Sequence, residues 1–204
     1  MDLTVVREAS HPLLPQAVHL HYDALSYRST ITAFGEPFLY ELYRALLDEG
    51  NGFVVVAHEG TRLIGFILGC VDSSRMMSVV PRRPLRFFTL MAPAMLRRPG
   101  LWPRMLQTLL YTRKEASDVA AELVVIAVVD DRRGAGIGKQ MLAALETELA
   151  SRGVDRFKVT VHQAMAASNR FYTQNAFQLT STFDMYGVPW NLYVKKVAPT
   201  EKAA

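Results

Sequence analysis

The feature that most constrains the fold of this chain is an apolar run followed by a glycine-rich loop and a helical pattern. The run ELVVIAVV at 122–129 is nearly continuous, as expected for a strand buried on both faces. Three glycines fall in the loop at 130–139, and apolar side chains then recur at helical spacing to Leu149 before Gly153 ends the pattern. A glycine loop in this position lets backbone N–H groups approach a phosphate closely, so the segment predicts a phosphate-binding site.

Two common phosphate-binding loops do not fit the spacing. An ATP- or GTP-type loop, G-x-x-x-x-G-K-[ST], can be anchored only on Gly138. The chain then has Arg133 in place of the first glycine and Gln140 in place of Ser or Thr. A dinucleotide loop, G-x-G-x-x-G, finds Lys139 or Met141 where its third glycine is needed. The sequence therefore excludes both types.

The rest of the chain alternates between strand and helix patterns. Helices are predicted at about 12–28, 36–49, 137–149 and 165–175, and strands at 3–8, 53–58, 63–71, 122–129, 156–161, 178–186 and 190–197. This order describes a single α/β domain over 1–197, with an inserted segment at 72–118 and a disordered tail at 198–204. Prolines divide the insertion, but its apolar stretches predict short helices.

The loop does fit the pattern [Q/R]-x-x-G-x-[G/A], with Arg133, Gly136 and Gly138 lying between a buried strand and a helix. In this the chain resembles the Gcn5-related N-acetyltransferase (GNAT) family. The resemblance covers about 1–71 and 119–197. It implies an α/β fold with a mixed central sheet, a splayed strand pair and flanking helices, to which this chain adds a helical basic insertion.

The resemblance also implies where acetyl-CoA binds. Its pantetheine arm lies in the opened strand pair and bonds to backbone groups of Ile126, Ala127 and Val128. The pyrophosphate lies over the loop and first helical turn, where unpaired N–H groups and the positive end of the helix dipole face it. Glycine at 136 and 138 lacks the Cβ that would hold the phosphates off, and Lys139 adds a positive charge. The residues implied at the pyrophosphate are Arg133, Gly134, Ala135, Gly136, Ile137, Gly138 and Lys139.

A second family signature, A-x-x-F/L-Y-x-x-x-G-F, resembles the segment AASNRFYTQNAF at 166–177. It implies that Tyr172 lies over the thioester sulfur and protonates the departing thiolate. A phenol has a pKa near ~10 and a thiol near ~8.5, so Tyr172 is protonated at neutral pH and able to donate. The alternative is a core aromatic residue beside Phe171 and Phe177.

The chain departs from the family pattern at two places. Met165 stands where members often carry asparagine, and Ala176 replaces the usual glycine. Asn169 either takes over a contact to pantetheine or phosphate, or caps the local backbone.

Acetylation of an amine also needs a base, because an ammonium group with a pKa near ~10.4 is almost fully protonated at pH 7. The resemblance implies Glu122 for this role, four residues before the first strand residue that contacts the acetyl group. The alternative is that a water chain removes the proton and that Glu122 is only a solvated residue at the start of the strand. Asp130 and Asp131 are more suited to shaping the turn or orienting the neighbouring arginines, and His162 to a structural role.

The resemblance places the acceptor between the first two helices and the last hairpin. The mixture of polar and aromatic residues there suits a sugar amine or a peptide end and selects neither. These residues are His19, His21, Tyr22, Tyr27, Arg28, Glu36, Tyr40, Tyr186 and Trp190.

The insertion carries the positive charge of the chain. The formal net charge is +4, but nine basic residues and no acidic one fall within 75–114, which leaves −5 for the rest. One interpretation is a cap and lid over the acceptor site, and another is an interfacial segment that contacts a membrane surface or an acidic substrate. No nucleic-acid-binding module surrounds the arginines, so nucleic acid is not expected. The side chains expected to pack the cap against the domain are Phe87, Phe88, Leu90, Met95, Leu106 and Leu109.

The remaining features bound the class of protein. The single cysteine, Cys70, lies in an apolar strand pattern and is expected to be a buried thiol, which together with the lack of a signal peptide predicts a cytoplasmic protein. No apolar run is long enough to span a bilayer, and the five histidines lack metal-ligand spacing, so no metal is expected.

The sequence thus predicts an acetyl-CoA-dependent N-acetyltransferase that acts on the primary amine of a small molecule, amino sugar or peptide. The alternative is a non-catalytic acyl-CoA-binding module that the basic insertion recruits to a membrane or anionic partner. The oligomeric state is not predicted.

Overall fold

A computed structural model describes residues 1–25, 31–98, 100–101, 118–185 and 187–197. Seven strands form one sheet in the order β1-β2-β3-β4-β5-β7-β6. The strands are β1 (Asp2–Val6), β2 (Gly52–Glu59), β3 (Arg62–Cys70), β4 (Glu122–Val128), β5 (Arg156–His162), β6 (Gln178–Met185) and β7 (Val188–Lys196). Only β4 and β5 pair in parallel, and the other neighbours are antiparallel. The predicted mixed sheet is therefore confirmed.

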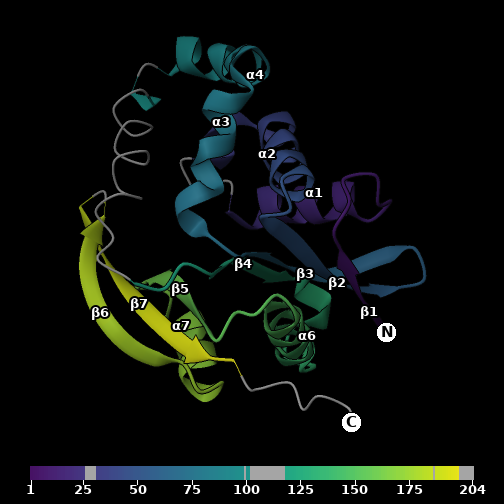
Figure 1. The fold of residues 1–204 in the computed structure, drawn as a ribbon, viewed down its shortest axis with the longest axis vertical. Helices are drawn as coiled ribbons and strands as arrows, with labels where there is room; N and C mark the ends of the chain where they lie inside the picture. Colours follow the sequence, from purple (N-terminus) through teal and green to yellow (C-terminus); the bar gives the residue numbers. More distant parts are fainter. Residues whose placement is uncertain (26–30, 99, 102–117, 186, 198–204) are drawn as a thin grey trace.

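Helices cover both faces of the sheet (Figure 1). On one face lie α1 (Leu14–Leu25), α2 (Glu36–Asp48), α3 (Val79–Arg82) and α4 (Pro84–Arg97), with α6 (Ile137–Ser151) and α7 (Ala166–Gln174) on the other. Short 3-10 turns occur at η1 (Thr32–Phe34), η2 (Ser73–Ser78) and η3 (Asp130–Arg132). None of the helices in the described ranges is long and apolar enough to cross a membrane.

The core has two parts because the sheet separates the two helical layers. The part under α1, α2 and α4 is built from buried side chains that include Leu14, Val18, Phe38, Leu39, Leu46, Phe66 and Phe87. The part under α6 and α7 includes Phe53, Ile67, Met141, Leu145, Phe157, Tyr172 and Phe177. Cys70 in β3 is fully buried as expected, and burial raises the pKa of its thiol.

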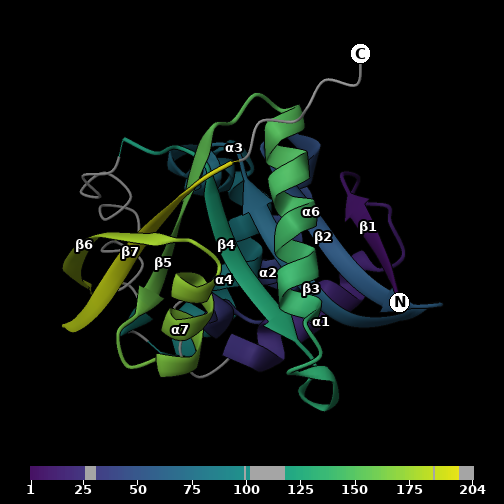
Figure 2. The ribbon, with the colours of Figure 1, turned by 90° about the horizontal axis from the view of Figure 1, so that it is seen from below.

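The parallel pair β4–β5 opens toward its carboxyl ends, as the fold prediction required (Figure 2). Glu122 pairs with Lys158, the Lys158 N–H bonds to the Ala121 carbonyl at 2.9 Å, and no later residues of the two described strands are in register. The central strand β4 is not buried on both faces as expected. Its side chains alternate between buried and half-buried along Glu122–Val128.

The part of the insertion that is described, η2, α3 and α4, is helical and packs on α2, which agrees with the cap interpretation. Phe87 and Met95 are buried as predicted, and Leu90 is partly buried. Phe88 was expected in this contact and is instead 65 % exposed, because α4 turns that side chain away from the domain. Leu106, Leu109 and the predicted tail at 198–204 lie outside the described residues.

An ion-pair cluster ties α6 to the end of β1. The buried carboxylate of Glu148 accepts hydrogen bonds from Arg7 Nη2 at 2.6 Å and Arg7 Nε at 2.9 Å, and it pairs with Arg152 Nη2 at 2.7 Å. Burial alone would raise the pKa of Glu148, but the hydrogen bonds from the two arginines outweigh it and lower that pKa. The carboxylate therefore stays charged inside the fold.

We predict that Glu148→Gln lowers the free energy of unfolding by about 2 kcal/mol, because a buried pair loses one charged partner. The effect should be present above the ordinary pKa of a carboxyl group and vanish as the pH falls through the lowered pKa of the folded state. Urea unfolding at several pH values measures it. Asp118→Asn is the control, since the Asp118–Arg156 pair is largely exposed and its loss should cost less than about 1 kcal/mol. Equal costs for the two variants would contradict the assignment.

Candidate functional site

The glycine loop leads from the end of β4 to an uncapped helix N-terminus. Gly134 and Gly136 have φ values of +81° and +77°, a left-handed conformation that L side chains rarely adopt. Gly136 is the N-cap of α6, and no side chain of the described residues caps the helix there. The first N–H groups of α6 therefore have no intrahelical partner and, with the helix dipole, favour an anion. A Cβ at either glycine would meet nothing within 4 Å in the described structure, so it would project into the open space before the helix.

Gly138 has a packing role that the sequence did not suggest. A Cβ at this position would lie 3.3 Å from Phe171 Cε2 and 3.6 Å from Ile126 Cδ1. Its absence lets α6 pack closely on α7 and on β4. Phe171 is thus a residue of the site that sequence analysis took only as a packing aromatic, and only the contact between two separate helices reveals its place.

Ion pairs fix the turn that precedes the glycines. Arg133 pairs with Asp130 at 2.7 Å, and its Nε donates to the Val128 carbonyl at 3.2 Å. Asp131 pairs with Arg62, the first residue of β3, at 3.1 Å. Asp130 and Asp131 are thus engaged in shaping the turn. Arg132, in contrast, pairs with Glu59 at 2.8 Å and not with either aspartate. Lys139 is exposed beside this turn, and so is Ala135.

The three β4 residues proposed to contact pantetheine do not present their backbones alike. Val129 donates its N–H to the Ile64 carbonyl of β3 at 3.0 Å. Backbone groups alternate between the two edges of a strand, so those of Ala127 also face β3, whereas those of Ile126 and Val128 face the opened edge. The geometry therefore favours Ile126 and Val128 as the residues with free backbone groups, and gives Ala127 a role in the ladder.

Tyr172 is a buried residue of α7. Its ring centroid lies 5.1 Å from that of Phe177, 5.5 Å from Phe171 and 6.0 Å from Tyr193. Burial raises the pKa of its phenol, so the protonated form is favoured further. Its hydroxyl makes no hydrogen bond to any of the described residues. Packing and proton donation are thus compatible in this residue, since the ring is held by its neighbours while the hydroxyl keeps its proton.

Asn169 forms the centre of a saturated polar network. Its Nδ2 donates to the carbonyls of His162 and Met165, at 3.1 and 2.9 Å, and to that of Gln163 at 3.2 Å. Its Oδ1 accepts from Asn191 Nδ2 at 2.8 Å and Tyr193 Oη at 2.9 Å. The side chain has no further capacity. Of the two roles considered for Asn169, the geometry favours the cap of local backbone over a contact to coenzyme.

Glu122 lies at the closed end of the opened strand pair. It is the register partner of Cys70 in β3 and of Lys158 in β5, so the three residues lie side by side across the sheet. Burial is the main cause that raises the pKa of the Cys70 thiol, and the negative charge of Glu122 is the second. The positive charge of Lys158 lowers that pKa. Lys158 is only 3 % exposed. Sequence analysis missed Lys158. Its neighbours Phe157 and Val159 pack in the core part under α6 and α7, so Lys158 lies on the other face of β5, the face that α1 and α2 cover.

The helices α1 and α2 place the predicted acceptor residues differently. His19 is exposed and lies 3.3 Å from Asp23 and 3.2 Å from Glu36, and the hydrogen bond with Glu36 is the main cause of its raised pKa. His21 was expected in the acceptor groove but is a core residue, 6 % exposed, with Nδ1 at 2.8 Å from Tyr43 Oη. Burial lowers the pKa of His21 to about 4.

The other acceptor residues are partly described. Tyr22, Tyr40, Glu36 and Trp190 are neither fully buried nor fully exposed, and the Nε1 of Trp190 is buried without a hydrogen-bond partner among the described residues. His162, at the end of β5, packs its ring edge-on against Trp190 at 5.6 Å and accepts the Ala164 N–H through Nδ1 at 3.0 Å, which suits the structural role expected for it. Tyr27, Arg28 and Tyr186 lie outside the described residues.

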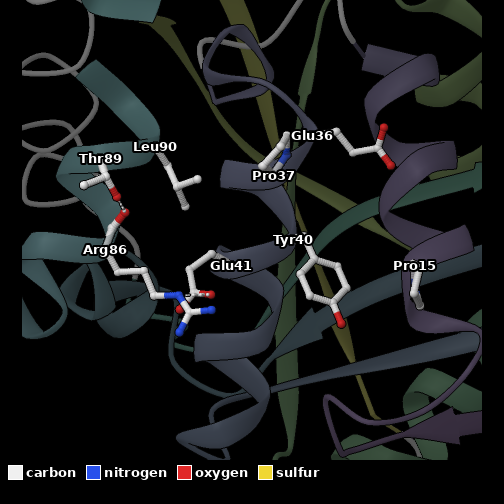
Figure 3. Close-up of a pocket in the computed structure, with 8 residues that line it drawn as sticks. All are labelled: Pro15, Glu36, Pro37, Tyr40, Glu41, Arg86, Thr89 and Leu90. Carbon is white, nitrogen blue, oxygen red and sulfur yellow. Dashed lines mark hydrogen bonds and ion pairs between the residues drawn. The ribbon is translucent and has the colours of Figure 1, made fainter. Parts of the chain in front are cut away.

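An open pocket of about 540 Å³ lies between the helices α1, α2 and α4 (Figure 3). Its floor is α2, with Tyr40 at the centre, and its walls come from α1 and α4. At one end Arg86 of α4 reaches Glu41 of α2 at 2.9 Å. The pocket is lined by Pro15, Glu36, Pro37, Tyr40, Glu41, Arg86, Thr89 and Leu90. No group of three potential ligands for a metal ion occurs in the described ranges.

Comparison with known proteins identifies relatives of this arrangement. A family model described as the acetyltransferase (GNAT) family matches residues 19–177. No curated protein matches the sequence significantly. An aminoglycoside 6'-N-acetyltransferase solved with coenzyme A is 14 % identical, with 98 % of each chain covered and a TM-score of 0.60. A ribosomal-protein-alanine N-acetyltransferase from Brucella melitensis is 18 % identical over 96 % of this chain and 99 % of that one, with a TM-score of 0.60. PaiA N-acetyltransferase from Thermoplasma acidophilum, solved with coenzyme A, is 14 % identical over 96 % and 99 %, with a TM-score of 0.56.

We predict that His19 and His21, two residues apart on α1, titrate on opposite sides of the ordinary histidine pKa of 6.5. His21 should stay neutral until about pH 4, because its burial disfavours the charged ring. Its pKa is lower in the folded than in the unfolded chain, so stability should fall, by about 3 kcal/mol in all, as the pH drops from 6.5 toward 4. Imidazole NMR titration measures both pKa values. His21→Asn should weaken this acid loss of stability and His19→Asn should not; a His21 ring that titrates above pH 6 would refute the prediction.

Proposed function

The chain belongs to the acetyltransferase (GNAT) family, and on that premise we propose that it transfers an acetyl group from acetyl-CoA directly to a primary amine of a small molecule, amino sugar or peptide. The observation that carries the proposal is the junction of β4 and α6. There an open strand edge, a glycine loop with two left-handed residues and an uncapped helix N-terminus follow one another within 126–139. The family match to 19–177 supports an acyltransferase, and two of the structural neighbours were solved with coenzyme A.

Acetyl-CoA fits this junction through main-chain contacts. The free backbone groups of Ile126 and Val128 bond to the pantetheine arm, and Ala127 holds the strand in the sheet from the other edge. The pyrophosphate lies over the loop, where the N–H groups of the first turn of α6 point at it. Bulk is absent at Gly134 and Gly136, while Arg133 and Lys139 supply positive charge at the rim. Ile137 anchors the helix start in the core, since it is 5 % exposed.

The reaction is a direct transfer. The neutral amine nitrogen attacks the thioester carbonyl carbon, a C–N bond forms and the C–S bond breaks. The N–H of Val128 polarises the carbonyl oxygen, in keeping with the direction of its backbone groups toward the opened edge. The departing thiolate takes a proton or accepts a hydrogen bond from Tyr172, whose phenol is kept protonated at neutral pH by burial. The phenol then regains a proton from solvent.

The proton that the amine loses goes to Glu122 or to a water chain. Glu122 is on β4, four residues before Ile126, so it lies about 13 Å from it along the strand and reaches the amine through water. Lys158 of β5 is the register partner of Glu122, so a basic side chain lies beside the proposed base. The side chain of Asn169 takes no part in the proposed reaction and holds α7 to β7.

We predict that Gly136→Ala weakens CoA binding at least about tenfold, because the new Cβ projects into the space that the pyrophosphate fills. Calorimetric titration with CoA measures the change. Gly153→Ala is a matched control at the other end of α6, since Gly153 has φ +74° and equally open surroundings. Both variants should lose about 1 kcal/mol of stability through backbone strain, but only the first should lose affinity. Equal affinities would contradict the proposed pyrophosphate site.

We predict that Tyr172→Phe lowers the turnover number about 100-fold and leaves the affinity for acetyl-CoA unchanged, because it removes the proton donor and keeps the ring. CoA release is followed with amino sugars, polyamines and peptides as acceptors. Tyr193→Phe is the control: it removes a hydroxyl from the same aromatic cluster, bonded to Asn169, and should cost about 1 kcal/mol of stability with turnover retained. Full turnover in Tyr172→Phe would disprove the donor role, and CoA binding without turnover on any acceptor would disprove the enzyme.

A further inference from the structure

Helix α4 has two apolar faces, and the described residues cover only one of them. Phe87, Met91 and Met95 are buried against the domain. Leu85 and Leu96 lie on the opposite side with Phe88, and their exposed fractions are 82 %, 85 % and 65 %. The positions 85, 88 and 96 fall on one stripe of a helix, with half-buried Ala92 between them. We call these three side chains the outer face of α4.

The outer face is the largest concentration of exposed apolar side chains in the described part of the chain. Six large apolar residues are exposed in the described part of the chain, and the three with the greatest exposed fractions are Leu85, Phe88 and Leu96. The others, Met1, Leu3 and Leu179, come from strands β1 and β6 or the amino end. Isolated exposed leucines are ordinary on a protein surface, but a stripe along a whole helix marks a binding surface.

The arginines of the insertion fall into two groups. Those near the domain are engaged in ion pairs, most of which dock the insertion on α2 and on Glu49 just after it, while Arg75 pairs with Asp72 inside the insertion. These pairs are Arg75–Asp72, Arg82–Glu49, Arg83–Asp48, Arg83–Glu41 and Arg86–Glu41. Arg97 and Arg98, at the end of α4 next to Leu96, are exposed and have no ion pair with any described residue. Part of the positive charge of the insertion is thus paired with acidic residues of the molecule, and the charges of Arg97 and Arg98 remain unpaired among the described residues beside the outer face.

We propose that the outer face of α4 lies on an anionic lipid bilayer, with Leu85, Phe88 and Leu96 at the level of the acyl chains and Arg97 and Arg98 among the headgroups. Leu and Phe on one side of a helix with flanking arginines is the composition of an interfacial helix. No acidic residue occurs from 75 to 114, so the surface meets anionic headgroups without repulsion from its own segment.

The position of α4 favours a flat partner. Figure 1 shows α4 at the outer edge of the molecule, beyond α2 and far from the sheet. A stripe from Leu85 to Leu96 on a single protruding helix is convex, so it can lie down on a plane, whereas it offers no concave site for a ligand or a peptide. The pocket beside α4 is lined by Arg86, Thr89 and Leu90 of this helix, and none of the three side chains of the outer face lines it. The proposal does not depend on the proposed acetyl transfer.

Co-sedimentation of the full chain with vesicles tests the proposal. Vesicles of phosphatidylcholine with phosphatidylglycerol should bind the protein at low salt, and phosphatidylcholine alone should bind it weakly. The triple variant Leu85→Ser, Phe88→Ser, Leu96→Ser should bind at least about tenfold more weakly to both. Arg97→Ala with Arg98→Ala should lose about tenfold or more on the anionic vesicles only, because each arginine near an anionic surface contributes about fivefold.

Leu179→Ser is the matched control, since Leu179 is 55 % exposed on β6 and should leave vesicle binding unchanged. All variants should keep the circular dichroism and the CoA affinity of the unaltered chain, because none of the changed residues lies near the glycine loop. Absence of binding to the anionic vesicles at low salt, or undiminished binding by the triple variant, overturns the proposal. Sedimentation velocity tests whether the face binds a second copy of the chain. A dimer that the triple variant abolishes, together with no vesicle binding, would assign the face to that second copy and would overturn the membrane proposal.

Discussion

The rest of the structure depends on the place where β4 and β5 part. Two parallel strands normally stay hydrogen-bonded along their length, but here Glu122 and Lys158 are the last residues in register. Beyond them β4 has one edge bonded to β3 and the other edge open. An open edge inside a sheet leaves backbone donors and acceptors in need of a partner. A linear amide such as a pantetheine arm meets that need, and the same separation makes the strand end at the glycine loop accessible.

The helix that follows depends on this opening as well. Gly136 turns the chain in a left-handed conformation so that α6 begins directly after the loop, and Gly138 lets Phe171 of α7 pack against its first turn. The uncapped N-terminus of α6 and the phenol of Tyr172 are therefore held by one set of contacts. Asn169, with its saturated hydrogen bonds to Asn191 and Tyr193, attaches α7 to β7.

The insertion is attached to α2 by ion pairs and by apolar contacts. Glu41 of α2, 3 % exposed, is surrounded by arginines from α2, α3–α4 and α4, while Phe87 completes the core beneath them. The sequence indicated a single basic segment, but its described arginines form two groups: those paired with acidic residues, and Arg97 and Arg98, which are exposed. The division follows from the opposite net charges of the insertion and the rest of the chain, which attract one another before any outside partner is involved.

The sequence by itself determined the order of strands and helices, the buried state of Cys70 and the turn between β4 and α6, because hydrophobic period and the conformational needs of glycine act over a few residues. Tertiary structure alone decided which neighbour each residue meets. It placed His21 in the core, turned Phe88 outward and gave Gly138 its reason in Phe171, since each of these depends on elements distant in sequence. The same holds for Ile126, Ala127 and Val128: the strand was evident from its apolar run, but the edge on which each backbone group lies is set by the register with β3.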